Sequence, residues 1–209
     1  MSEYKNFVQD FPIRCQDVLN TARKQARFCD REVTLLLMTA STGIVVPYER
    51  LIPQSEKTLK KVVKDEETYV EASKEFVELL KLKFLDRTKF WGTIVPGNWF
   101  AGKAPWDWPP DSWDSKILQS PMSENMTFSG VVKIIRNSLA HGGICTRGDP
   151  IELLVFASGY SENKGNKKKS EKLSYVAVAP DVFMGFLSRW FDFLKELRLP
   201  DFVHDEEAA

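Results

Sequence analysis

The residues best suited to chemistry lie in one short segment, IRNSLAHGG, from Ile135 to Gly143. The chain has only two histidines, and one of them, His141, follows Arg136 after four intervening residues. An imidazole exchanges protons near neutral pH, and a guanidinium offers a permanently charged fork that fits a phosphate oxygen. Asn137 adds an amide that can orient either group. These side chains suit metal-free phosphodiester chemistry better than ester or peptide cleavage, because no Ser or Cys nucleophile has the necessary base and acid nearby.

A helix is expected to hold these side chains, since apolar residues recur at helical spacing from Phe128 onward and stop at Gly142-Gly143. The predicted core stripe of this helix consists of Val131, Val132, Ile135 and Leu139. A second face, directed away from that core, carries Lys133, Arg136, Asn137, Ala140 and His141. His141 lies in the last turn, where the helix dipole favours the imidazolium. The small Ala140 would let a second helix approach this face closely.

The spacing of apolar residues in the rest of the sequence predicts four other helices and one hairpin. The helices are expected over residues 7–28, 30–43, 65–86 and 180–197, with Asp30 as the N-cap of the second. Residues 45–53, VVPYERLIP, are interpreted as a turn and connector. Two β-prone runs, 151–160 and 173–179, flank a polar loop and predict a hairpin.

Residues 91–126 interrupt this pattern with five prolines and five of the six tryptophans, at 91, 99, 106, 108 and 113. This density of proline excludes a long helix. The segment is interpreted as an ordered flap packed on the helices, because each tryptophan has a large apolar area to bury. The alternative is an aromatic platform on which unpaired bases stack.

The charge balance limits how the protein could bind nucleic acid. The 209 residues carry 29 Lys and Arg against 29 Asp and Glu, which argues against a general phosphate-coating protein. Between residues 128 and 172, however, eight basic residues face four acidic ones, so a compact basic site is compatible with the sequence. The basic residues expected to contact RNA are Lys133, Arg147, Lys167, Lys168 and Lys169.

Cysteine usage and the chain ends set the remaining expectations. Cys15, Cys29 and Cys145 are odd in number, far apart and without a CxxC pair, which predicts neither a zinc site nor a disulfide framework. No metal or cofactor is expected. The first residues lack a signal-peptide pattern and no apolar run is long enough for a bilayer, so a cytoplasmic protein is expected. Residues 1–200 are interpreted as one domain, and the acidic residues 201–209 as a disordered tail.

The segment IRNSLAHGG resembles the RxxxxH motif of HEPN domains (higher eukaryotes and prokaryotes nucleotide-binding), in which a polar residue, here Asn137, follows the arginine. The order of elements is also similar, with the motif in a late core helix before a closing helix. REVTLLLMTASTGIVVPYERL, from Arg31 to Leu51, and the hairpin are similar to a bacterial and plasmid-borne HEPN subgroup. The resemblance implies a mainly α fold, a HEPN-like helical bundle with a β-hairpin between the motif helix and the C-terminal helix.

For activity, the resemblance implies a homodimer whose two motif helices form one cleft, and metal-independent cleavage of RNA, often by the toxin of a toxin-antitoxin or antiviral system. Arg136 would then stabilise the scissile phosphate, His141 would act as general acid or base around the ribose 2′-OH, and Asn137 would position one of them. An antitoxin protein is an implied partner. Gly143 stands where one toxin subgroup has a tyrosine, so nucleotidylation of that tyrosine is not expected here.

Two other interpretations of the motif stay open at this point. In the first, a noncatalytic HEPN module binds RNA, a nucleotide or a protein partner through the same residues. In the second, the residues are structural only: His141 caps its helix, and Arg136 forms a surface salt bridge worth less than about 1 kcal/mol.

Overall fold

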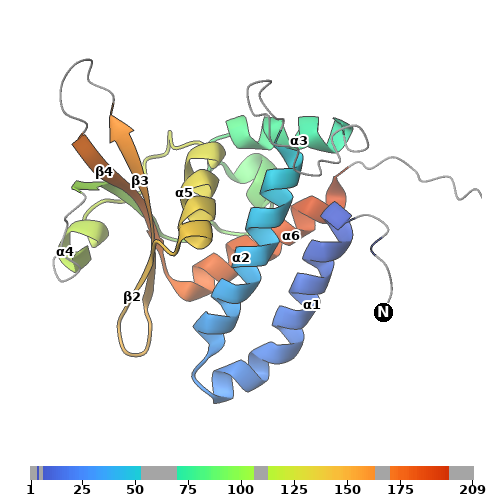
Figure 1. The fold of residues 1–209 in the computed structure, drawn as a ribbon, viewed down its shortest axis with the longest axis horizontal. Helices are drawn as coiled ribbons and strands as arrows, with labels where there is room; N and C mark the ends of the chain where they lie inside the picture. Colours follow the sequence, from blue (N-terminus) through green and yellow to red (C-terminus); the bar gives the residue numbers. More distant parts are fainter. Residues whose placement is uncertain (1–3, 5–6, 53–69, 106–112, 163–169, 198–209) are drawn as a thin grey trace, which may run out of the picture.

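The structure is a computed structural model of the chain, and it describes residues 4, 7–52, 70–105, 113–162 and 170–197 (Figure 1). The helices are α1 (Phe7–Phe28), α2 (Glu32–Leu51), α3 (Val70–Lys81), α4 (Trp113–Leu118), α5 (Phe128–His141) and α6 (Pro180–Glu196), with a short π-helix, η1 (Arg87–Trp91). The strands are β1 (Trp99–Pro105), β2 (Ile144–Arg147), β3 (Leu153–Glu162) and β4 (Ser170–Val178). They form one antiparallel sheet in the order β1-β4-β3-β2. The fold is mainly α-helical, as predicted.

Helix α5, which carries the motif, lies between the sheet and the other helices. Figure 1 shows the sheet at one end of the molecule, with α4 on one side of it and α5 on the other. Helix α5 contacts β3 and β4 on its sheet side and α2 and α3 on its helical side. Helices α1 and α2 lie side by side and complete the bundle with α6. The motif helix is therefore held from two directions.

Helix α6 supplies much of the core. Its predicted apolar face is buried in full and consists of Phe183, Phe186, Leu187, Trp190, Phe191, Leu194 and Leu197. The ring of Phe186 packs among the rings of Phe84, Phe90 and Trp99. Burial of each such side chain contributes about 1.5–3 kcal/mol to folding. This aromatic cluster joins α6 to the segments that precede α5.

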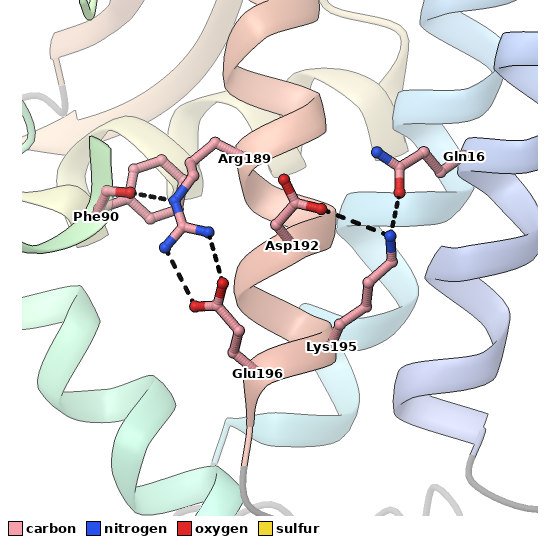
Figure 2. A network of polar contacts seen from close by, with 6 residues as sticks. All are labelled: Gln16, Phe90, Arg189, Asp192, Lys195 and Glu196. Carbon is pink, nitrogen blue, oxygen red and sulfur yellow. Dashed lines mark hydrogen bonds and ion pairs between the residues drawn. The ribbon is translucent and has the colours of Figure 1, made fainter. Parts of the chain in front are cut away.

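Polar contacts fix α6 at its surface, as Figure 2 shows. Arg189 donates from Nε to the carbonyl oxygen of Phe90 in η1, and its Nη1 and Nη2 lie 3.1 and 3.2 Å from the two carboxylate oxygens of Glu196. Lys195 donates to Oε1 of Gln16 in α1 at 2.5 Å and lies 3.5 Å from Asp192. Helix α6 is thereby linked to η1 on one side and to α1 on the other.

The prediction of a connector at residues 45–53 was wrong for the residues that the structure describes there, because α2 continues through Pro47 to Leu51. A proline inside a helix has no N–H to donate to the carbonyl four residues earlier, here that of Gly43. Trp190 fills this vacancy by donating from Nε1 to the Gly43 oxygen at 2.9 Å. A tertiary hydrogen bond that local sequence does not reveal thus replaces the missing bond of the helix.

Two other predicted helix boundaries also differ. Asp30 is not the N-cap of α2; it adopts φ 55° in the turn after α1, and α2 begins at Glu32. The helix expected over residues 65–86 is described from Val70 and ends at Lys81, while residues 65–69 lie outside the described part. After Lys81 the chain bends, Lys83 forms an isolated antiparallel bridge with Thr127, the N-cap of α5, and a turn follows at residues 84–85.

The described parts of the proline-rich segment, residues 91–105 and 113–126, pack as part of the fold. Residues Trp99–Pro105 form β1, which pairs with β4, and the sheet is therefore larger than the predicted hairpin of β3 and β4. Trp91 and Trp99 are 1% and 3% exposed, and their indole N–H groups donate to the carbonyls of Phe84 and Pro96. The base-stacking alternative is wrong for these two tryptophans. Trp106 and Trp108, and the side chain of Trp113, lie outside the described residues.

Several sequence expectations concern parts that the structure does not describe. Lys167, Lys168 and Lys169 of the predicted loop and the acidic tail at 201–209 lie outside the described residues. Among the helices that are described, none combines the length and apolar character of a bilayer-spanning segment.

We predict that Gly43→Ala lowers stability relative to Gly185→Ala. Both glycines lie inside helices, where alanine is favoured by about 1 kcal/mol. A Cβ at Gly43 would lie 2.5 Å from the ring of the buried Phe191, whereas a Cβ at Gly185 meets no atom within 4 Å. Overpacking of this kind costs about 1–3 kcal/mol. Urea unfolding should show this difference between the variants, and equal free energies of unfolding would contradict the close packing of α2 against α6.

Candidate functional site

The motif helix α5 begins and ends at fixed points of the structure. At its start, the Thr127 hydroxyl accepts a hydrogen bond from the Gly130 N–H at 3.2 Å. Phe128 N–H donates to the carbonyl of Leu82, which ties this end to the chain after α3. At its other end, Gly142 adopts the left-handed conformation with φ 74°, as expected for the first of the two glycines.

Gly143 joins the end of α5 to the sheet. Its carbonyl accepts a hydrogen bond from the Ala157 N–H in β3 at 2.8 Å. A Cβ at this position would collide with the Ala157 carbonyl oxygen, so glycine allows the close approach. The contact places the residue after Ala157, Ser158, beside the motif helix.

The core face of α5 agrees with the predicted stripe. Val131, Val132 and Ile135 are fully buried, and Leu139 is half-buried. Ser138 is also buried, at 1% exposure, although the stripe did not include it. Its hydroxyl donates to the Ile134 carbonyl at 2.7 Å, so the helix itself satisfies this polar group.

Arg136 does not point away from the core as predicted, because it packs against α2. Its side chain is 25% exposed, and its Nη2 forms an ion pair with Oε1 of Glu49. The guanidinium carbon lies 5.4 Å from the centre of the Tyr48 ring, within range of a cation–π interaction. Burial raises the pKa of Tyr48, and the charge of Arg136 opposes that rise. The arginine is therefore anchored between two residues of α2.

Asn137 links Arg136 to the sheet. Its Oδ1 accepts a hydrogen bond from Nη1 of Arg136 at 2.5 Å, and its Nδ2 donates to the Ser158 hydroxyl in β3 at 3.2 Å. Glu49, Arg136, Asn137 and Ser158 thus form a continuous polar chain across α2, α5 and β3. We call these four residues the polar chain.

His141 is the last residue of α5 and is exposed, like Ala140 beside it. In the part of the chain that the structure describes, its side chain makes no hydrogen bond or ion pair. It lies one helical turn beyond Asn137, on the same side of α5. The structure therefore brings Arg136 and Asn137 into contact and leaves the imidazole accessible to a ligand or to another protein chain.

The predicted basic residues are placed only in part. Lys133 is exposed on α5, one turn before Asn137, and Arg147 is half-buried on β2. The three loop lysines, as stated above, lie outside the described residues. The candidate site thus has one exposed lysine of the predicted set on the motif helix itself.

Tyr48, Glu49 and Ser158 were not among the residues predicted for the site. The first two were missed because residues 45–53 were interpreted as a connector. The sequence does contain a signal for these two residues. One helical spacing of buried residues continues across Pro47, from Leu36, Ala40 and Ile44 to Tyr48 and Leu51. Ser158 has no such signal, because only the packing of α5 on β3 places it near Asn137.

A cavity of about 780 Å³ lies elsewhere, between the α1–α2 turn, residues 149–152 and the start of α6. None of the motif residues lines it, and its lining contains more acidic than basic residues, which disfavours RNA. The described residues also contain no group of three or more His, Cys, Asp and Glu arranged to hold a metal ion. Of the motif helix, Ala140 and His141 are exposed.

A family model described as HEPN pEK499 p136 matches residues 1–200 of the chain. No curated protein and no solved structure shows a significant match.

We predict that Gly142→Ala lowers the free energy of unfolding by about 1 kcal/mol, because alanine is strained in the left-handed conformation. Gly142→Asn should cost less, since asparagine adopts this conformation more readily. Urea unfolding of both variants measures the difference. A Gly142→Ala variant as stable as wild type would contradict the described end of α5.

Proposed function

The chain belongs to the HEPN pEK499 p136 family, and we propose on this premise that it is a metal-independent endoribonuclease with Arg136, His141 and Asn137 as its catalytic residues. The observation that carries the proposal is the arrangement on α5. Arg136 is anchored by Glu49 of α2 and by its own neighbour Asn137. His141 is exposed one turn further along the same helix. A charged group for a phosphate and a group for proton transfer thus belong to one rigid element.

In the proposed reaction, the ribose 2′-oxygen attacks the adjacent phosphorus, and the bond from phosphorus to the 5′-oxygen breaks. His141 takes the 2′-OH proton or gives a proton to the leaving 5′-oxygen. Arg136 stabilises the negative charge that develops on the phosphate oxygens, and such stabilisation is commonly the largest part of catalysis. Asn137 holds the guanidinium in place. Lys133, Arg147, Lys167, Lys168 and Lys169 are proposed to attract the RNA backbone.

A second copy of the chain would complete this site. The motif helix of one chain carries one imidazole, whereas attack and departure call for both a base and an acid. Two copies of α5 that face each other across Ala140 would supply two imidazoles and two guanidinium groups. The exposure of Ala140 and His141 supports this arrangement, because both remain available for an interface. We therefore propose a homodimer through the motif helix.

In the cell, we propose that the protein acts as the toxin of a toxin-antitoxin or antiviral defence system, with an antitoxin protein as its partner. RNA cleavage by an unrestrained nuclease slows growth, and such a nuclease requires a partner that blocks the cleft. The exposed face of α5 is the surface that such a partner would cover.

We predict that the purified protein cuts single-stranded RNA in the presence of EDTA and leaves DNA of the same sequence intact, because DNA lacks the 2′-OH. His141→Ala should reduce the cleavage rate by about 100-fold or more, the scale expected for loss of a general acid or base. Substitution of the other histidine, His204→Ala, is the matched control and should leave the rate unchanged. Gel electrophoresis of labelled RNA measures these rates.

Cleavage that survives His141→Ala, or that needs a divalent metal, would contradict the proposed chemistry. RNA binding by the wild type without any product would instead favour the noncatalytic HEPN module. Expression in cells adds a second readout: the wild type should slow growth, and the His141→Ala variant should not.

We predict that Ala140→Arg converts the protein from a dimer to a monomer, because a large charged side chain would separate the two motif helices. Cleavage should be lost together with the dimer. Light scattering at micromolar concentration measures the mass of wild type and variant, and Thr21→Arg, which places the same side chain on the exposed surface of α1, is the control. A wild type that is monomeric, or a monomeric variant that still cleaves RNA, would contradict the composite site.

A further inference from the structure

The polar chain of Glu49, Arg136, Asn137 and Ser158 gives two of these residues a role that the motif does not contain. We propose that Glu49 is the positioning residue for Arg136 and that Ser158 is the positioning residue for Asn137. This proposal rests on the proposed function and deepens it, because it adds α2 and β3 to a site otherwise confined to α5.

Glu49 holds a side chain that would otherwise be mobile. An arginine has many rotamers, and a free guanidinium on a helix surface would sample several directions. In this structure the Arg136 guanidinium is in contact with Glu49 through Nη2, Asn137 through Nη1 and Tyr48 through its face. These partners come from both α2 and α5, so the packing of the two helices sets the direction in which the Arg136 guanidinium points.

The contacts leave Arg136 able to bind a phosphate. A guanidinium carries one N–H on Nε and two on each Nη. The ion pair and the hydrogen bond engage each Nη atom once, so each keeps a second N–H for a ligand oxygen. The side chains of Glu49 and Arg136 are 46% and 25% exposed, so part of the pair faces solvent, whereas Oε1 of Glu49 and Nε of Arg136 are buried. Glu49 thus orients the arginine without occupying all of its donors.

Ser158 acts at the other end of the polar chain, next to Asn137. Its hydroxyl accepts a hydrogen bond from Nδ2 of Asn137, which fixes the amide so that Oδ1 points to Arg136. The bond between Ala157 and Gly143 fixes Ser158 at this place, because it sets the position of β3 against the end of α5. A shift of β3 would therefore move Asn137 and, through it, change the position of the Arg136 side chain.

The test compares variants that remove a contact with variants that keep it. Glu49→Ala removes the ion-pair partner of Nη2 and should lower kcat for RNA cleavage by about 10- to 100-fold, since small errors in position cost factors of this size. Glu49→Gln keeps the length of the side chain and an oxygen that faces Nη2, and it should restore most of that loss. Ser158→Ala and Ser158→Thr form the same comparison for Asn137, with rescue expected from the threonine hydroxyl.

A double-mutant cycle separates positioning from a general effect on the fold. If Glu49 acts through Arg136, Glu49→Ala should weaken binding of a 2′-deoxy-substituted RNA in the wild-type background and have no effect in an Arg136→Ala background. Glu71→Ala is the matched control, because it removes another helical glutamate with an ion pair, to Lys74, away from the motif. Fluorescence anisotropy gives the affinities, and urea unfolding checks that each variant is folded.

Equal effects of Glu49→Ala on RNA affinity in both backgrounds would overturn the proposal. Tighter RNA binding by both Glu49 variants would also overturn it, because Glu49 would then inhibit Arg136. Failure of Glu49→Gln and Ser158→Thr to restore activity would also contradict it. Wild-type protein that binds RNA without cleaving it would contradict the proposed function alone. The binding cycle, which involves no chemistry, would then decide the positioning proposal.

Discussion

The hydrogen bond from Trp190 to the Gly43 carbonyl is the interaction on which the site depends. Pro47 removes a backbone donor from α2, and a buried carbonyl without a partner would cost about 1–3 kcal/mol. Because Trp190 supplies the donor, α2 continues to Leu51 as a regular helix. Tyr48 and Glu49 then lie on a helix that packs against α5, where both contact Arg136. A core tryptophan on α6 thus determines the surroundings of an arginine on α5.

The second constraint is the position of α5 between the helices and the sheet. Its start is tied to the chain after α3 and its end to β3, so the helix has little freedom to rotate or slide. Within this frame the Arg136 and Asn137 side chains are fixed by neighbours, while His141 and Ala140 are exposed. This difference along one helix agrees with the proposal that one chain forms an ordered half of a site and that a second copy completes it.

Much of this structure could be predicted from the sequence. The bounds of α5, the buried face of α6 and the hairpin of β3 and β4 follow from local periodicity and from the glycine and proline signals at their ends. The family was likewise recognised from the segment IRNSLAHGG. The environment of Arg136 could not be predicted, because it depends on α2 passing Pro47, and that depends on a hydrogen bond from a residue 147 positions away in the sequence. β1 was also missed, since it pairs with β4 over sequence separations that run from 79 positions (Trp99 and Val178) to 67 (Pro105 and Lys172).

The most direct test of the proposed chemistry is the identity of the ends that cleavage leaves on RNA. Attack by the 2′-oxygen, with Arg136 and His141 as the acting groups, leaves a 2′,3′-cyclic phosphate on one product and a 5′-hydroxyl on the other. Mass spectrometry of a short RNA cut in EDTA distinguishes these ends from a 3′-hydroxyl and a 5′-phosphate. The account predicts the cyclic phosphate from wild-type protein. Products with a 5′-phosphate would contradict it, because they require attack by water in place of the ribose 2′-OH.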